Sequence, residues 1–312
     1  MLSKNIKKRL LQSVEKYLLQ LSCENYSQKT IESYRYDLNL FVSLLEQSNK
    51  ISTFKQAVNE QCLIDTISLR YEKNPQITPF TIRRYACAYR SWINFLIDNK
   101  TLPPEFGRFR FNLPKLPQIL PKSLPMALIH SLLKQTIDKQ NTMISFRNGC
   151  IFELMALSGL RISEVVNLRL TDLSLSQRQI KVVGKGQKQR IVPISTQTAE
   201  RIGQYLSLRN KKQWQYDYLF LSNCGNPLHP SVVRRALRKV TKNMQLSQRI
   251  TPHMLRHSCA THFVKQTHDI RFVQILLGHT DISTTQAYAH LDTEHIGKMF
   301  DKYNATIKQS DD

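Results

Sequence analysis

A proline-rich segment, residues 102–125 with the sequence LPPEFGRFRFNLPKLPQILPKSLP, constrains the fold of this chain most. It holds six of the twelve prolines and lacks the spacing of apolar residues that an amphipathic helix requires. Such a segment is typical of an extended linker between domains. Because 312 residues are long for one hydrophobic core, we expect two domains, over residues 1–115 and 116–312.

Both predicted domains are basic. The chain has 45 lysines and arginines against 23 acidic residues, a formal charge of +22, and the ratio is 18 to 10 before residue 116 and 27 to 13 after it. Charge of one sign on two domains favours a polyanion held between them, so DNA or RNA is the expected partner. An anionic membrane surface is the second candidate partner. A membrane role is less favoured, because no run of the sequence reaches the roughly 18 apolar residues of a spanning helix.

The N-terminal sequence and the cysteines point to the cytoplasm. MLSKNIKKRLLQSVEKYLLQL is amphipathic and is interrupted by Glu15, unlike a secretory signal. The six cysteines form no C-x-x-C pair, so neither a disulfide framework nor a zinc ribbon is expected.

The first domain is predicted to be a small helical bundle. SQKTIESYRYDLNLFVSLLEQ and TPFTIRRYACAYRSWINFLIDN repeat apolar residues at helical spacing, and Thr78 and Pro79 form a cap and a first-turn proline. On the second of these helices three arginines are candidate DNA-phosphate contacts: Arg83, Arg84 and Arg90. A solvated helix face is the alternative for each of them.

The second domain is predicted to be mostly helical with one β-hairpin. RQIKVVGKGQKQRIVPI, residues 178–194, has β-branched runs on both sides of a Gly-Lys-Gly turn, which places Lys185 near the tip. The Walker pattern is missing, so this turn is no phosphate loop. A lysine in a turn is usually a solubilising charge, and Lys185 has a function only if other residues need a mobile cation.

An anion site is predicted at the start of RITPHMLRHSCATHF. Thr251 can cap a helix, which places His253 and Arg256 on one face beside the free backbone N–H groups. A metal pair of His253 and His257 is the alternative. It ranks low, because no third ligand has suitable spacing and the arginine would repel a cation.

A second arginine lies in LMALSGLRISEVVNL. Gly159 can end one helix and Ser163 can cap the next, leaving Arg161 in the joint, where Glu164 can brace its guanidinium. The alternative is an ordinary contact at the helix end.

LLGHTDISTTQAYAHL, residues 276–291, places Tyr288 nine positions after His279. A phenol has a pKa of about 10 and is a poor nucleophile at neutral pH unless neighbours activate it. Alone, Tyr288 would be read as a core or surface aromatic. Together with two arginines, a lysine and two histidines, nearly all at predicted helix ends or turns, it favours a phosphate-handling site.

A strongly basic helix is predicted in HPSVVRRALRKVTKNM and is a candidate for the DNA major groove. One side is apolar, with Val233, Ala236, Leu237, Val240 and Met244. The rest of its surface carries Arg234, Arg235, Arg238, Lys239 and Lys242.

The ordered set of reactive residues resembles the tyrosine recombinases, also called the phage integrase family. The set comprises Arg161, Lys185, His253, Arg256, His279 and Tyr288. The intervals of 24 and 68 residues between the first three look like those of the Xer subfamily, and LDTEHIGKMFDKYNA after the tyrosine is similar to the tail of the XerC branch. The chain departs from the family pattern at two places. Cys259 stands where an aromatic residue is usual, and Thr267-His268-Asp269 stands where Xer proteins commonly have a Gly-Ala turn.

The resemblance implies a mainly α fold. An N-terminal core-binding bundle of the SAM-like type and a mostly helical catalytic domain with a small antiparallel sheet would form a clamp around DNA. It also implies that Tyr288 forms a covalent 3′-phosphotyrosyl intermediate, with Lys185 as acid, His253 as base, and the two arginines and His279 on the phosphate. No cofactor or metal is implied.

The implied partner is double-stranded DNA with a short pseudo-palindromic site. Recombination would occur in a heterotetramer with a second Xer-type recombinase such as XerD, or in a homotetramer, with a DNA translocase such as FtsK as a possible activator. The expected role is the resolution of chromosome or plasmid dimers during segregation. The alternatives are a phage or mobile-element integrase, a type IB topoisomerase and a non-enzymatic DNA-binding regulator.

Overall fold

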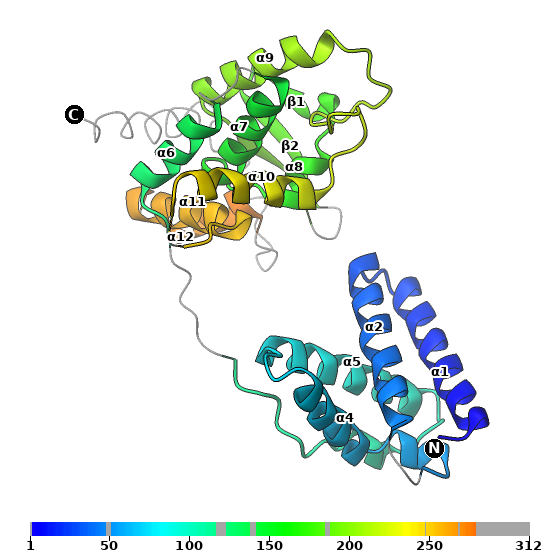
Figure 1. Ribbon diagram of the computed structural model, residues 1–312. Helices are drawn as coiled ribbons and strands as arrows, with labels where there is room; N and C mark the ends of the chain where they lie inside the picture. Colours follow the sequence, from blue (N-terminus) through cyan, green and yellow to red (C-terminus); the bar gives the residue numbers. More distant parts are fainter. Residues whose placement is uncertain are drawn as a thin grey trace. The chain divides into compact units, whose positions relative to one another are not determined.

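The computed structural model describes residues 2–47, 51–116, 123–137, 142–184, 188–246, 248–267 and 269–278. The chain divides into two compact units, Met1–Ile119 and Leu120–Asp312, and each unit has its own hydrophobic core. Both are mainly helical (Figure 1).

The first unit is the predicted helical bundle. Its elements are α1 (Lys4–Cys23), α2 (Gln28–Leu45), α3 (Phe54–Ala57), α4 (Glu60–Lys73), α5 (Pro79–Asp98) and the 3-10 helix η1 (Pro104–Gly107). The predicted cap of α5 is confirmed, because the Thr78 side chain accepts a hydrogen bond from the Thr81 N–H at 3.3 Å. Aromatic rings of α5 fill the core, where Tyr85, Tyr89 and Trp92 are buried.

A buried carboxylate ties α2 to α5 in this unit. Asp37 has no exposed surface, and Arg84 donates two hydrogen bonds to its carboxylate at 2.8 and 3.0 Å. Arg70 of α4 lies 4.0 Å from the same carboxylate. A buried charge of this kind is tolerated only when paired, so Arg84 has a structural role.

The second unit surrounds one central helix. Its helices are α6 (Met126–Ile137), α7 (Met143–Ala156), α8 (Ile162–Asn167), the 3-10 helix η2 (Leu170–Asp172), α9 (Thr196–Asn210), α10 (Pro230–Asn243), α11 (Pro252–Thr267) and α12 (Ile270–Leu277). Every residue from Gly149 to Ala156 of α7 is buried, and α6, α8, α9, α10 and α11 all contact α7 (Figure 1). Apart from Glu153, which pairs with Arg201 of α9, this stretch has no charged side chain on any side, as expected for a helix in the middle of a core.

A small antiparallel sheet completes the unit, as predicted. Its strands are ordered β1 (Leu173–Ser174), β2 (Gln179–Val183) and β3 (Gln189–Pro193). In the hairpin Ile180 pairs with Val192 and Val182 with Arg190. Directly opposite residues share a face, and these three apolar side chains are buried, so Arg190 lies on the inner face.

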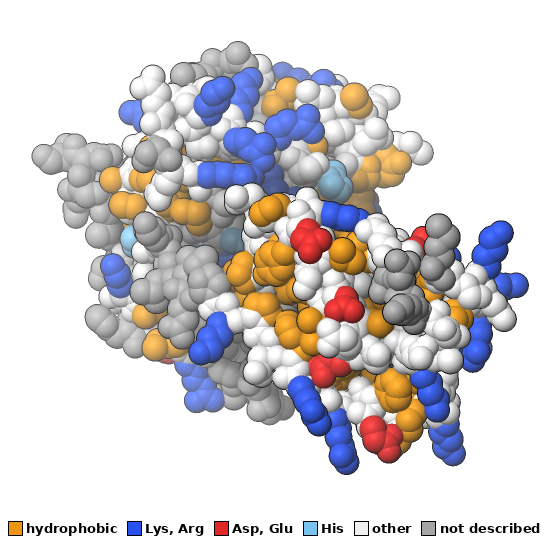
Figure 2. Space-filling view, turned by 60° about the horizontal axis from the view of Figure 1, so that its bottom comes forward, with side chains coloured by type: hydrophobic (Ala, Val, Ile, Leu, Met, Phe, Trp, Pro, Cys, Tyr) orange, Lys and Arg blue, Asp and Glu red, His pale blue; other side chains and the backbone are white. Residues whose placement is uncertain are grey.

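The surface is rich in basic side chains. On the face drawn in Figure 2, lysines and arginines (blue) are spread widely, whereas aspartates and glutamates (red) are few. Within the described ranges, no helix has the length and apolar character needed to cross a membrane.

Candidate active site

The site is built around Glu164 in the first turn of α8. Its carboxylate accepts hydrogen bonds from the Arg161 backbone N–H at 2.7 Å and from Arg161 Nη1 at 2.9 Å. The predicted bracing of Arg161 by Glu164 is therefore confirmed. The prediction that Ser163 caps this helix is wrong, because Arg161 occupies the N-cap position and the Glu164 carboxylate satisfies its N–H.

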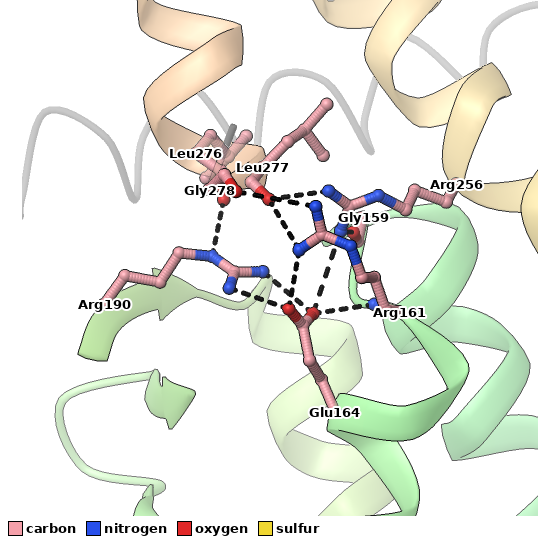
Figure 3. Close-up of polar contacts among 8 residues, drawn as sticks. All are labelled: Gly159, Arg161, Glu164, Arg190, Arg256, Leu276, Leu277 and Gly278. Carbon is pink, nitrogen blue, oxygen red and sulfur yellow. Dashed lines mark hydrogen bonds and ion pairs between the residues drawn. The ribbon is translucent and has the colours of Figure 1, made fainter. Parts of the chain in front are cut away.

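Three arginines from separate segments converge on this one carboxylate (Figure 3). Arg190 of β3 donates from both terminal nitrogens to the two Glu164 oxygens, at 3.0 and 2.9 Å. Arg256 of α11 lies 3.7 Å from the same carboxylate. Glu164 thereby links α8, the hairpin and α11.

The same arginines hold the end of α12. Arg190 Nε donates to the Leu276 carbonyl at 3.0 Å, and Arg256 Nη2 donates to the Leu277 carbonyl at 2.6 Å. Arg161 lies farther off, with its terminal nitrogens 3.5 Å from the Leu277 and Gly278 carbonyls. These are the unpaired carbonyls that every helix end leaves, and the following Gly278 has the positive φ of 66° usual at such an end.

Gly159 allows these segments to pack closely. Its φ is +66°, and a Cβ at this position would lie 2.4 Å from Leu277 Cδ2 and 3.2 Å from Cys259 Sγ. Its carbonyl accepts a hydrogen bond from Arg256 Nη1. A small residue that tolerates left-handed backbone is therefore required beside α12.

The cluster is electrostatically suited to an anion. Burial raises the pKa of the Glu164 carboxyl, but hydrogen bonds from Arg190 and Arg161 outweigh that effect and hold the pKa below its ordinary value. Burial, followed by the nearby charge of Arg161, lowers the pKa of Arg256 to about 10, so Arg256 is still a cation at neutral pH. Three guanidinium groups face one carboxylate, which leaves an excess of positive charge.

Arg161 is the most accessible of the three arginines. Its side chain is 35% exposed, compared with 14% for Arg190 and 10% for Arg256. Its guanidinium is thus open to a ligand, while Arg256 is fixed in place by two carbonyls.

His253 lies at the start of α11, one turn before Arg256. The predicted cap is confirmed, because the Thr251 side chain accepts from the Met254 N–H at 3.3 Å. His253 is exposed and Arg256 is buried. Among the residues that the structure describes, no three histidine, cysteine or acidic side chains are grouped to hold a metal.

Three of the predicted site residues, Lys185, His279 and Tyr288, lie outside the described residues. Lys185 belongs to the connection between β2 and β3, and His279 directly follows Gly278 in the sequence.

Sequence reasoning missed Arg190, although its position in the predicted hairpin carried a signal. In an extended strand every second residue lies on the same face, so residues 190, 192 and 194 share one face. Val192 and Ile194 of that set are buried. An arginine in register with buried apolar residues indicates a paired guanidinium directed inward.

The arginines predicted on α5 have partners within their own unit. Arg84 binds Asp37, and Arg90 donates to the Phe111 carbonyl with its guanidinium 4.9 Å from the Phe109 ring centroid. Arg83 is exposed and makes a long hydrogen bond of 3.4 Å to the Pro114 carbonyl. These contacts account for Arg84 and Arg90 without DNA.

The predicted basic helix is α10, and its two-sided pattern is confirmed. Val233 and Leu237 are buried in the core of the second unit. All five of the basic residues are exposed: Arg234, Arg235, Arg238, Lys239 and Lys242.

Comparison with known proteins decides the family. Residues 127–295, more than half of the chain, match the phage integrase family, and residues 14–100 match the phage integrase N-terminal SAM-like domain. The chain belongs to the phage integrase family. The predicted enzyme class, a site-specific tyrosine recombinase, and the SAM-like character of the first helical bundle are confirmed by these matches and by the relatives below.

Relatives in the family include both Xer branches. The chain is 34% identical to tyrosine recombinase XerD of Halalkalibacterium halodurans, over 85% of this chain and 88% of that protein. It is 33% identical to tyrosine recombinase XerC of Actinobacillus pleuropneumoniae serotype 7, over 91% of this chain and 90% of that protein. The two identities are nearly equal, so the XerC branch stays a prediction.

The fold is similar to that of a solved recombinase. The XerH site-specific recombinase, in a pre-cleavage complex with its difH substrate, aligns with a TM-score of 0.71 at 19% identity, over 96% of each chain. This similarity supports the mainly helical fold with its small sheet.

Proposed function

We propose that this recombinase acts in Xer-type resolution of chromosome or plasmid dimers. The observation that carries the chemical part of the proposal is the convergence of Arg161 and Arg256 beside Glu164, next to the end of α12. The chain leads from that helix end through His279 to Tyr288. Arg256 thus contacts the chain at Leu277, only 11 residues before the nucleophile.

In the proposed reaction, the two arginines bind the non-bridging oxygens of a DNA phosphodiester. This group carries one negative charge and gains a second as the tyrosine oxygen adds to phosphorus. The excess positive charge of the cluster favours the more negative transition state. His279 adds a hydrogen bond to the same oxygens.

Proton transfer completes each step. His253 accepts the phenolic proton of Tyr288, whose oxygen forms a bond to phosphorus while the bond to the 5′-oxygen breaks. Lys185 gives a proton to that leaving oxygen. The products are a 3′-phosphotyrosyl bond and a 5′-hydroxyl, and attack by the 5′-hydroxyl of another strand reverses the step without nucleotide or metal.

Recognition is proposed to be separate from cleavage. Each unit contributes basic side chains to a clamp on a duplex, with α10 in the major groove and phosphate contacts providing affinity. In the first unit Arg83 is the strongest candidate of the three predicted arginines, because it is exposed and, among the described residues, makes only a long hydrogen bond of 3.4 Å to a backbone carbonyl, whereas Arg84 pairs with a buried carboxylate and Arg90 stacks on an aromatic ring.

The assembly is proposed to be a tetramer on a short pseudo-palindromic site in the cytoplasm. A second recombinase of the XerD type would complete a heterotetramer, and an FtsK-type DNA translocase would activate it. The chain is similar to tyrosine recombinases of both the XerC and the XerD branch, so a homotetramer is the alternative assembly. A mobile-element integrase is the alternative role.

A recombination assay on a plasmid with two copies of a candidate site tests the proposal. Resolution into two circles, dependent on both sites, is the expected result. Relaxation of supercoils on a plasmid without such sites would instead indicate a topoisomerase, and binding without strand cleavage would indicate a regulator.

A further inference from the structure

A second concave site lies in the catalytic unit, away from the Glu164 cluster. An open pocket of about 360 Å³ is lined by the start of α7, the loop after Leu221 and one side of α10. Its polar lining comprises Arg147, Asn148, Ser222, Asn223, Arg235 and Lys239. The lining includes three cations and no carboxylate.

Arg147 is an unusual member of this lining because it is a buried cation. The residue is 3% exposed, and its guanidinium donates to the Leu221 carbonyl at 2.7 Å and to Asn148 Oδ1 at 3.1 and 3.3 Å. Both acceptors are neutral, and within the described part of the chain no carboxylate oxygen lies within 4.0 Å of it. A buried guanidinium without a counter-charge is unfavourable, so an anion in the pocket would stabilise it.

The pocket also distinguishes two basic sides of α10. Arg235 and Lys239, four residues apart, line the pocket. Arg238 and Lys242, also four residues apart, are exposed and do not line it. The two pairs have the same residue types and the same spacing, and they differ in whether their side chains share a concave surface with Arg147.

We propose that this pocket binds a phosphate group of the DNA backbone. Arg235 and Lys239 contact the phosphate oxygens, Asn148 and Asn223 offer amide donors, and the buried charge of Arg147 stabilises the bound anion. The contact is independent of DNA sequence and assigns Arg235 to affinity rather than to base recognition. The inference rests on the proposed function in that DNA is the ligand.

Two double variants of the full chain test this assignment. Arg235→Gln with Lys239→Gln removes the pocket pair, and Arg238→Gln with Lys242→Gln is the matched control with equal charge loss. Binding to a fluorescent duplex of unrelated sequence is measured between about 50 and 200 mM salt. The pocket variant should reduce the slope of log affinity against log salt by about 1, so that its affinity falls about fourfold less than that of the wild type over this range.

The control pair should change this slope by less than half as much. A wild-type slope for the pocket variant, or equal reductions for both pairs, would contradict the proposal, because charge loss alone would then explain the data. Equal thermal midpoints of the two variants without ligand establish that both fold.

A second measurement separates DNA phosphate from free phosphate. Inorganic phosphate, exchanged for chloride at constant ionic strength, should raise the thermal midpoint of the control variant more than that of the pocket variant. If phosphate raises the thermal midpoint in this way but the pocket variant has the wild-type slope of log DNA affinity against log salt, a free phosphate is the ligand and the DNA assignment is wrong. Covalent attachment through Tyr288 is measured separately, so failure of the proposed chemistry leaves this slope test intact.

Discussion

Replacing Arg190 with methionine tests whether the arginine cluster is one coupled unit. Arg190→Met keeps most of the side-chain volume and removes the guanidinium. Two hydrogen bonds to Glu164, at 3.0 and 2.9 Å, and one to the Leu276 carbonyl, at 3.0 Å, are lost. Among the described residues, Glu164, whose side chain is 4% exposed, then keeps its contacts with Arg161 and, at 3.7 Å, with Arg256.

The expected loss of unfolding free energy is about 3 kcal/mol. Removing one partner of a buried ion pair costs about 3–5 kcal/mol, and the lower end applies because Arg161 still pairs with Glu164. Arg190→Lys should recover part of this loss, because a lysine supplies the charge without the two-pronged hydrogen bonding. Glu164→Gln in the Arg190→Met background should cost less than in the wild type.

Hydrogen exchange of peptides from α7 and α8 is the appropriate assay, because it reports the stability of the catalytic unit by itself. The effect should depend on pH. The folded pKa of Glu164 is depressed, so its stabilisation is complete above the unfolded pKa of about 4.3 and is lost as pH falls through the lower folded pKa. The difference between wild type and Arg190→Met should therefore shrink below about pH 4. A cost under about 1 kcal/mol at pH 7, or a difference that is unchanged at low pH, would refute the coupled cluster.

Three further substitutions probe the packing and the chemistry. Gly159→Ala should destabilise the catalytic unit by about 2–4 kcal/mol, from the left-handed φ and from the clash with Leu277 Cδ2; wild-type exchange protection in α11 would disprove this. Arg256→Lys should slow single-turnover cleavage by about 10²–10³ while duplex affinity changes little; an equal loss of affinity would assign it to binding alone. Lys185→Ala should slow cleavage of ordinary DNA, and a 5′-bridging sulfur should restore much of the rate because it leaves without a proton; no restoration would remove the acid assignment.

Part of this site followed from local sequence rules. Thr251 as a helix cap, the pairing of β2 with β3, and the contact of Glu164 with Arg161 depend on residues no more than 14 positions apart, and the structure has all three. Helix caps and turns are determined by backbone chemistry that a short sequence reveals.

Other features depend on contacts between distant residues, which spacing does not reveal. Arg190 reaches Glu164 across 26 positions, and Arg84 reaches Asp37 across 47. Sequence spacing gives no sign of the first contact. For Arg84 it offers a phosphate contact or a solvated helix face, and neither includes the buried carboxylate that Arg84 neutralises. Ser163 was a reasonable cap by residue type, but the longer side chain of Glu164 satisfies the N–H of Arg161.

The most direct test of the central claim is covalent capture on a suicide duplex nicked near a candidate site. Cleavage releases a short DNA fragment that carries the 5′-hydroxyl needed for rejoining. Because this fragment is lost, the protein should accumulate as a covalent adduct, which a denaturing gel detects. Peptide mass spectrometry should locate the DNA on Tyr288, at a 3′-phosphate, and Tyr288→Phe should bind the duplex without forming any adduct. An adduct that persists in Tyr288→Phe, or that maps to another residue or to a 5′-phosphate, would contradict the account.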